Sequence, residues 1–295
     1  VDRWETMDES ANFYDELPKE FRTRLRDTPA QNSVASHIEK HNLGTRTKKR
    51  LPKGESYPVD FSGADPMHNG ARYARDDGRS TKLDCMATSI HEGFLRKRVS
   101  CHPGGLRGTP GKFPAPERPE VAFIGMSNVG KSSLLNAVTR TMRLAPAAFD
   151  PGVTRSLDWY KPSKLPLDII DLPGYGSAKG ADFGSLVIDF VATRKSLRCL
   201  YVLLDARRGL LPGDWRWLQL LGEEGPEKVF VLTKCDLVPP KLLARTTTLL
   251  LQDLKGMPNT SPRMILVSAK SGTGMHDLRV DLSKRAVKWT RDAAE

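Results

Sequence analysis

The chain has 295 residues, of which 39% are hydrophobic and 27% are charged, and its formal net charge is +11. It contains no apolar run of about eighteen residues, which excludes a membrane-spanning helix of ordinary length, so no membrane insertion is expected. The cysteines are too few and too scattered for a disulfide framework, and Cys85, His91, Cys101 and His102 contain no pair at zinc-site spacing. We therefore expect reduced thiols at these positions.

The positive charge is unevenly distributed along the chain. Residues 1–39 carry a net charge of −4, residues 40–119 carry +8, and residues 120–295 carry +7. Basic clusters occur at residues 46–50 and 96–98. Such an excess can neutralise phosphates and release counterions, which makes nucleic acid the natural partner, with a merely solvated surface as the alternative.

The segment before residue 120 lacks sustained hydrophobic periodicity. A helix is expected near residues 11–26, where apolar side chains recur every four residues, whereas residues 103–119 hold five prolines and four glycines. Such a composition buries too little apolar surface to offset the cost of ordering the backbone. Residues 1–119 are therefore expected to form an extended basic arm with little autonomous fold, which binds RNA or a ribonucleoprotein; a tether or processing remnant is the alternative.

From residue 120 onward, short apolar runs alternate with segments of helical periodicity. The runs occupy residues 121–124, 167–170, 200–204, 229–232 and 264–267. Strands that alternate with helices predict an α/β fold with a mostly parallel sheet flanked by helices on both faces. Residues 120–295 are expected to form this single domain.

The sequence VAFIGMSNVGKSSLLN at residues 121–136 places the pattern G-x-x-x-x-G-K-[ST] between an expected strand and an expected helix. The glycines let backbone N–H groups turn toward phosphate oxygens, and the helix N-terminus adds partial positive charge. Lys131 would reach the β- and γ-phosphates, and the Ser132 hydroxyl would take a Mg²⁺ position. The pattern predicts a phosphate-binding loop.

Two further motifs concern the γ-phosphate and Mg²⁺. In the sequence DLPG, Asp171 ends an expected strand and can hold Mg²⁺ through a water, while the N–H of Gly174 can sense the γ-phosphate. Thr154 lies in the Pro/Gly loop at residues 151–154 and could close over the same ion. The order of these motifs is that of a nucleotide switch.

The last two motifs concern the base. In TKCD, the Asp236 carboxylate can accept hydrogen bonds from the N1–H and exocyclic amine of guanine, a pattern that adenine does not offer, and the Lys234 stem would pack along the base. In the sequence SAK at residues 268–270, a backbone N–H can reach the guanine carbonyl oxygen. The motifs together favour GTP over ATP.

Residues 120–290 resemble the YihA/EngB family of ribosome-assembly GTPases, within the translation-factor-related P-loop GTPases. The resemblance is carried by residues 127–137, 151–154, 171–179, 233–236 and 268–274. It implies a Ras-like, monomeric G domain that binds GTP or GDP with Mg²⁺ and hydrolyses GTP. It also implies as partners the large ribosomal subunit precursor, its rRNA and ribosomal proteins, and other assembly factors.

This sequence departs from the family at two positions. Met126 stands where the family usually has Arg, and Leu237 follows Asp236 where Lys is usual. Both departures bear on the expected affinity for nucleotide and not on the resemblance to the family.

Hydrolysis is expected to be slow in the isolated protein. Tyr175 stands where many GTPases carry the glutamine that orients the attacking water, and a protonated phenol is no general base. Asn128 resembles the asparagine that in related GTPases helps to hold a K⁺ ion, although it could simply shape the loop. The ribosomal particle is the second expected source of stimulation.

The resulting site prediction has three parts. The expected catalytic groups are Asn128, Lys131, Thr154 and Gly174, and the expected Mg²⁺ ligands are Ser132, Thr154 and Asp171. The expected nucleotide-binding residues are Gly125, Ser127, Asn128, Val129, Gly130, Lys131, Ser132, Ser133, Asp171, Gly174, Thr233, Lys234, Asp236, Ser268, Ala269 and Lys270.

The predicted cellular location and the predicted GTPase activity each have an alternative. The long arm and a first residue other than Met, on a bacterial-type domain, favour the mitochondrial matrix, with another organelle or the bacterial cytoplasm as the alternative. A non-catalytic nucleotide-binding scaffold of a ribonucleoprotein particle is the alternative to a GTPase.

Overall fold

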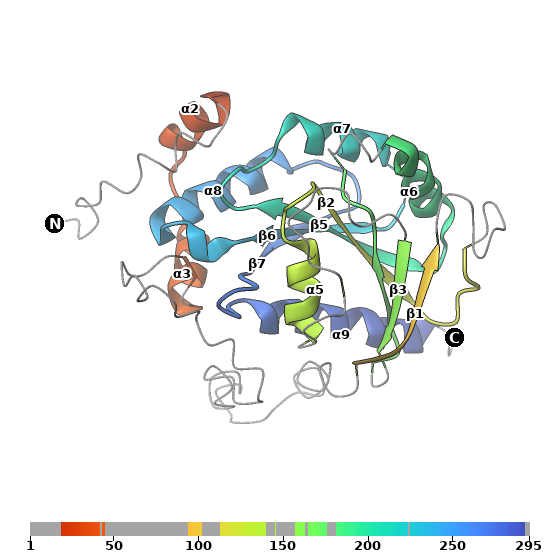
Figure 1. The fold of residues 1–295 in the computed structure, drawn as a ribbon. Coiled ribbons are helices and arrows are strands. Elements are labelled where there is room, and N and C mark those ends of the chain that lie inside the picture. The colour runs from red at the N-terminus through yellow and green to blue at the C-terminus, as the bar shows by residue number, and fades with distance from the viewer. Residues whose placement is uncertain are drawn as a thin grey trace, which may run out of the picture.

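The computed structural model describes residues 19–41, 43–44, 94–101, 113–139, 145, 157–162, 165–175, 181–223 and 225–292. The helices are α2 (Lys19–Asp27), α3 (Asn32–Lys40), α5 (Lys131–Thr139), α6 (Ala181–Thr193), α7 (Pro212–Leu220), the short η2 (Cys235–Leu237), α8 (Pro240–Asp253) and α9 (Met275–Asp292). The strands are β1 (Phe94–Cys101), β2 (Glu120–Gly125), β3 (Leu157–Pro162), β4 (Asp168–Asp171), β5 (Leu197–Asp205), β6 (Glu227–Thr233) and β7 (Thr260–Leu266) (Figure 1).

The strands form one sheet in the order β1-β3-β4-β2-β5-β6-β7. The five strands β4, β2, β5, β6 and β7 run parallel to one another, whereas β3 is antiparallel to both β4 and β1. Each of the five expected apolar runs overlaps one of the parallel strands, so the predicted mostly parallel sheet is confirmed. The antiparallel strands β1 and β3 were not expected, because neither forms a continuous apolar run.

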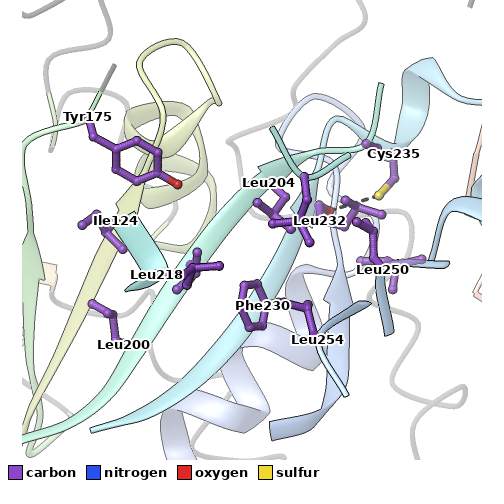
Figure 2. Close-up of a cluster of buried hydrophobic side chains, with 14 of the residues drawn as sticks. Ile124, Tyr175, Leu200, Leu204, Leu218, Phe230, Leu232, Cys235, Leu250 and Leu254 are labelled. Atoms are coloured by element: carbon purple, nitrogen blue, oxygen red, sulfur yellow. Dashed lines mark hydrogen bonds between the residues drawn. The ribbon is translucent and has the colours of Figure 1, made fainter. Parts of the chain in front are cut away.

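Helices cover the sheet on both faces, which explains why all six residues of β2 are buried. Along β2, Ala122 and Ile124 belong to one apolar cluster, and Val121 and Phe123 belong to the other, as the alternation of a strand requires. Figure 1 shows α6, α7 and α8 on one side of the sheet and α5 and α9 on the other. Figure 2 shows part of the first cluster, where side chains of α7 and α8 pack on the sheet.

The helices α2 and α3, which precede the expected domain, pack on α8. Phe21, Leu25 and Ile38 are buried in the same cluster as the apolar face of α8. Arg24 pairs with Asp253 at the end of α8. Part of the segment before residue 120 therefore lies against the domain.

The expected helix near residues 11–26 is described only from the first residue of α2, and its earlier part lies outside the described residues. The expected division of the chain after residue 119 stays a prediction. The basic cluster at residues 46–50 also lies outside the described residues. None of the helices in the described part of the chain combines the length and apolar character needed to cross a membrane.

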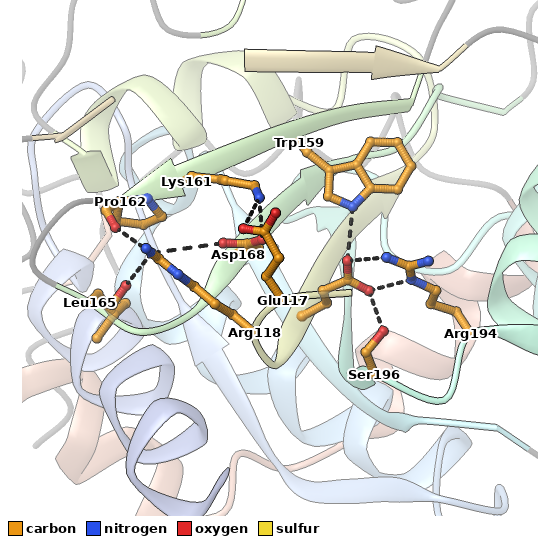
Figure 3. A network of polar contacts seen from close by, with 10 residues as sticks. Glu117, Arg118, Trp159, Lys161, Pro162, Leu165, Asp168, Arg194 and Ser196 are labelled. Carbon is orange, nitrogen blue, oxygen red and sulfur yellow. Dashed lines mark hydrogen bonds and ion pairs between the residues drawn. The ribbon is translucent and has the colours of Figure 1, made fainter. Parts of the chain in front are cut away.

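Two buried carboxylates lie side by side at the start of β2 and β4, where Glu120 faces Asp168 in the sheet register. Glu120 accepts hydrogen bonds from Trp159 Nε1 at 2.9 Å, from two nitrogens of Arg194 at 2.6 Å, and from Ser196 Oγ at 2.6 Å (Figure 3). Its negative charge is therefore well compensated by nearby donors.

The negative charge of Asp168 is less well compensated by neighbouring groups. Its two oxygens lie 4.0 Å from Arg118 Nη1 and 3.9 Å from Lys161 Nζ (Figure 3). Burial raises the pKa of Asp168 to about 6, because it outweighs the opposing effects of these two cations. Asp168 is thus ionised at neutral pH at some cost in free energy.

This cost makes stability depend on pH. In the unfolded chain an aspartate has a pKa of about 3.9, whereas the pKa of Asp168 in the folded protein is about 6. Between these two pH values the folded state binds more protons than the unfolded state, so the free energy of unfolding falls as pH rises. We expect Asp168→Asn to gain stability relative to the wild type from pH 4 to pH 7, by at most about 3 kcal/mol. Urea unfolding across this range measures the difference.

Glu117→Gln is the matched control, because its carboxylate also pairs with Lys161 but its side chain is 65% exposed. The difference between this variant and the wild type should change little with pH. A pH-independent difference for Asp168→Asn would contradict the raised pKa.

Candidate functional site

The loop between β2 and α5 turns tightly at two residues with left-handed backbone. Asn128 has φ 64° and Gly130 has φ 99°. A side chain at Gly125, where the loop begins, would place its Cβ 2.9 Å from both the carbonyl oxygen of Leu203 and Val129 Cγ1. The loop then enters α5 at Lys131, so its backbone N–H groups and the helix N-terminus form the kind of concavity that binds anions.

Lys131 and Asp171 form an ion pair beside this loop. Lys131 is 7% exposed and Asp171 is fully buried. The parallel register sets Phe123 of β2 opposite Asp171 at the end of β4, which brings the carboxylate to the end of β2. A buried cation and carboxylate compensate each other's desolvation, so the pair is held in place.

Gly174 brings the chain that follows Asp171 against the loop. A Cβ at this glycine would lie 3.2 Å from the carbonyl oxygen of Gly125 and 3.4 Å from atoms of Ser127. The next residue, Tyr175, accepts a hydrogen bond from Ser127 N at 2.9 Å and donates one to Gly125 O at 3.3 Å. The motif of Asp171 and Gly174 therefore lies beside the phosphate loop, as its order in the sequence predicts.

The end of β6 is tied to the same loop. Thr233 Oγ1 lies 2.7 Å from the carbonyl oxygen of Val129. Lys234, which has a left-handed φ of 57°, donates from Nζ to Asn128 O at 2.6 Å and to Asp205 Oδ2 at 2.9 Å. The base motif and the phosphate loop thus share direct contacts.

The loop after β7 holds the remaining motif. Ser268 Oγ donates to Asp236 Oδ1 at 2.7 Å and accepts from Ser271 N at 3.1 Å. Gly274 closes the loop with φ 76°, and a Cβ there would lie 1.9 Å from the carbonyl oxygen of Leu266. Only glycine fits, and the compact loop positions Ser268 to orient the Asp236 carboxylate.

The structure therefore brings the described motif residues together along the carboxyl edge of the parallel strands. Ser132 and Ser133 lie in the first turn of α5, and Ala269 and Lys270 lie in the loop after β7. Thr154, the loop at residues 151–154, and residues 176–179 lie outside the described residues. The oxygen donors of Ser132 and Asp171 suit Mg²⁺, and the loop amides with Lys131 suit phosphates.

Asp205 is a site residue that the sequence reasoning missed. It ends β5, accepts hydrogen bonds from Lys234 and from Arg207, and lies beside the loop. Burial alone raises the pKa of its carboxyl, but the hydrogen bonds from Arg207 and Lys234 outweigh it and lower the pKa below its ordinary value. Its position directly after the apolar run at residues 200–204, at the carboxyl end of a parallel strand, was the available signal.

Tyr175 turns its phenol away from the loop and into the core. Its hydroxyl donates to Asp214 Oδ1 at 2.6 Å, and its ring stacks on Trp217 with centroids 5.2 Å apart. Figure 2 shows Tyr175 close to Ile124 at this end of the apolar cluster. Burial and the neighbouring Asp214 carboxylate raise the pKa of Tyr175, which keeps the phenol protonated. Tyr175 anchors the end of residues 171–175 to α7.

Asn128 has a conformation that explains its presence without any ion. Asparagine tolerates the left-handed region better than most residues, and this conformation places the backbone carbonyl oxygen of Asn128 where it accepts the Lys234 hydrogen bond. The loop-shaping role is therefore supported, and the expected role in K⁺ binding stays a prediction.

The anchor predicts a local effect of Tyr175→Phe. Removal of the hydroxyl leaves a buried Asp214 oxygen without its donor, at a cost of about 1–3 kcal/mol. Because the lost bond ties residues 171–175 to α7, we expect faster amide hydrogen exchange in that segment, measured by mass spectrometry.

Tyr201→Phe is the matched control, since Tyr201 is also buried and donates to Asp281 at 2.6 Å in the other apolar cluster. It should lower stability without selectively changing exchange at residues 171–175. Equal exchange in that segment for both variants would contradict the proposed anchor.

Comparison with known proteins gives matches centred on this domain. The family described as "50S ribosome-binding GTPase" matches residues 120–234. A probable GTP-binding protein EngB of Sinorhizobium fredii is 35% identical over 202 residues, which cover 62% of this chain and 91% of that protein. The probable EngB of Gluconobacter oxydans is 38% identical over 181 residues, which cover 60% and 79% of the two chains.

A solved structure is also similar to this chain. The crystal structure of a probable GTP-binding protein engB is 24% identical, covers 57% of this chain and 99% of its own, and superposes with a TM-score of 0.46. The family match includes the segments that carry the phosphate-loop motif and the motif of Asp171 and Gly174. The sequence matches confirm the family expected from those segments: the chain belongs to the EngB family of GTP-binding proteins.

Proposed function

We propose that this protein binds GTP with Mg²⁺ and hydrolyses it as an assembly factor of the large ribosomal subunit. The observation that carries the proposal is the convergence of four motif segments on one sheet edge. The Lys131–Asp171 pair lies at one end and the Asp236–Ser268 pair lies at the other. Lys234, two residues before Asp236, donates to the carbonyl oxygen of Asn128 in the loop that precedes Lys131. The distribution matches a nucleotide with phosphates at the first pair and a base at the second.

The base end supports guanine. Ser268 donates to one Asp236 oxygen, which fixes the orientation of the carboxylate plane. A fixed carboxylate accepts from two adjacent donors on guanine, whereas adenine presents an acceptor at N1. The stem of Lys234, held by Asn128 and Asp205, is placed to flank the base.

The phosphate end supports charge stabilisation rather than base catalysis. Lys131 and the loop amides would bind the β- and γ-phosphates, and Gly174 N–H would contact the γ-phosphate. Ser132 and Asp171, with Thr154, would hold Mg²⁺, which neutralises charge on the phosphate oxygens. Since Tyr175 is turned toward Asp214 and stays protonated, no described side chain at this position acts as general base.

Hydrolysis in the isolated protein should accordingly be slow, and the ribosomal particle and K⁺ are the proposed stimulants. An ordered particle could supply positive charge and fix the attacking water. Asn128 is the proposed K⁺-binding residue. The matched family is described as ribosome-binding, and the basic excess of residues 40–119 suits rRNA as a partner together with ribosomal proteins and other assembly factors.

We place this function in the mitochondrial matrix, because the chain carries a long basic segment before a bacterial-type domain. The similar proteins are bacterial, so another organelle or the bacterial cytoplasm is the alternative. A second candidate function is a non-catalytic scaffold that binds nucleotide, which is favoured by the absence of a general base at Tyr175.

Asp236→Asn tests the base assignment. The amide offers a donor where the carboxylate offered an acceptor, so the variant should lose GTP affinity and gain affinity for xanthosine triphosphate, with a change in preference of at least about 100-fold. Equilibrium titration with fluorescent nucleotides measures both affinities.

Asp205→Asn is the control at the neighbouring strand end. It loosens Lys234 and should weaken the binding of both nucleotides without a change in preference. An Asp236→Asn variant that still selects GTP would overturn the role of Asp236.

Co-sedimentation with large-subunit precursors from mitochondria tests the cellular role. We compare GDP with a non-hydrolysable GTP analogue, use Lys131→Ala as the variant that loses phosphate binding, and measure phosphate release in K⁺ and in Na⁺. Binding only with the analogue, with particle-stimulated release, is the expected result. Equal binding with both nucleotides and no stimulated release would favour the scaffold, and no binding would refute the ribosomal role.

A further inference from the structure

His37, His41 and Asp277 converge at the boundary between the N-terminal helices and the domain. His37 lies in the last turn of α3, His41 is the residue that ends this helix, and Asp277 lies in the first turn of α9. One ligand atom from each of the three side chains lies within 4.8 Å of the other two. The centroids of the two imidazole rings are 4.4 Å apart, and His37 Nε2 lies 4.0 Å from Asp277 Oδ2.

The contacts that attach α3 to the domain do not account for this cluster. Ile38 packs into the apolar core, and Gln31 N donates to Thr248 Oγ1 of α8 at 3.0 Å. The two histidines instead face α9. They are four residues apart on a helix, so they share one face, which is the spacing used by helical histidine pairs that bind zinc.

The donor atoms of the cluster suit a cation. The imidazole nitrogens and the carboxylate oxygen each offer a lone pair that a transition-metal ion accepts. The C-terminus of α3 adds partial negative charge, which also favours a cation.

We propose that His37, His41 and Asp277 bind one divalent transition-metal ion of the zinc class, which links α3 to α9. Two imidazole nitrogens and one carboxylate oxygen form a donor set that zinc prefers and that Mg²⁺ and Ca²⁺ do not. The fourth position of a tetrahedral site is open to water.

The geometry allows the site to close with small movements. Ligand atoms about 2.1 Å from zinc in a tetrahedral arrangement lie roughly 3.4 Å apart. The side chains of His37 and Asp277 are 41% and 34% exposed, so rotation about their χ angles can close the remaining gap without disturbing the core.

The metal would connect two parts of the chain with different roles. Asp277 follows the compact loop that positions Ser268 against Asp236, whereas α3 belongs to the segment before residue 120. Zinc would therefore fix the N-terminal helices to the element that begins beside the base-recognition loop. This inference is independent of whether the protein hydrolyses GTP.

Calorimetric titration of Zn²⁺ into the full chain tests the site, with GDP and Mg²⁺ present to occupy the nucleotide site. All proteins in this titration, including the one used as wild type, carry Cys85→Ser and Cys101→Ser, which removes thiols that could bind zinc elsewhere. We expect one equivalent of Zn²⁺ to bind, and His37→Ala, His41→Ala and Asp277→Asn each to weaken binding by more than about tenfold. Mg²⁺ or Ca²⁺ alone should give no heat at this site.

His276→Ala is the matched control, because it removes a histidine from the first turn of the same helix but not from the cluster. It should leave Zn²⁺ affinity unchanged, and GDP binding by each variant verifies its fold. Hydrogen exchange in α3 should slow on addition of Zn²⁺ and quicken again with chelator. Zn²⁺ affinity that is the same in the wild type and the three ligand variants, or no Zn²⁺ binding, would overturn the proposal.

Discussion

The parallel pairing of β2 with β4 on one side and β5 on the other is the constraint on which the site depends. Every residue of β2 is buried, so a slip in register would move apolar side chains out of both clusters at once. The register that results sets Asp171 opposite Phe123 and Leu203 opposite Gly125. The phosphate loop and the carboxylate therefore meet because the core fixes the strands that carry them.

Electrostatic contacts then hold the loops at the sheet edge. Lys131 at the start of α5 pairs with Asp171 at the end of β4, and Lys234 after β6 joins the Asn128 carbonyl oxygen to Asp205 at the end of β5. The hydrogen bond from the Tyr175 hydroxyl to Asp214 is a third such contact, which joins Tyr175 to α7. The loops that would contact a nucleotide are thus restrained by charge and hydrogen bonds as well as by the burial of Val129 and Tyr175 in the apolar clusters.

The N-terminal helices show how a segment with too little apolar surface of its own can still become ordered. α2 and α3 each contribute few large apolar side chains, and these are buried because the domain presents complementary surfaces, the apolar face of α8 and, for Phe21, the backbone at Gly209. Their docking also brings two histidines against α9. A part of the chain that could not form a core alone thereby becomes an element of the domain surface.

The sequence by itself determined the parallel strands and the identity and order of the motif residues, among them Lys131, Asp171 and Asp236, because each depends on a local pattern with its own physical signature. Only the tertiary structure decided three further features. These are strands β1 and β3, the hydrogen bond between Tyr175 and Asp214, and the contact by which Asp205 holds Lys234. These features join residues about 30 to 70 positions apart, or depend on which side chain is buried against which. No local pattern encodes such pairings, since packing and desolvation act between elements that meet only after the chain has folded.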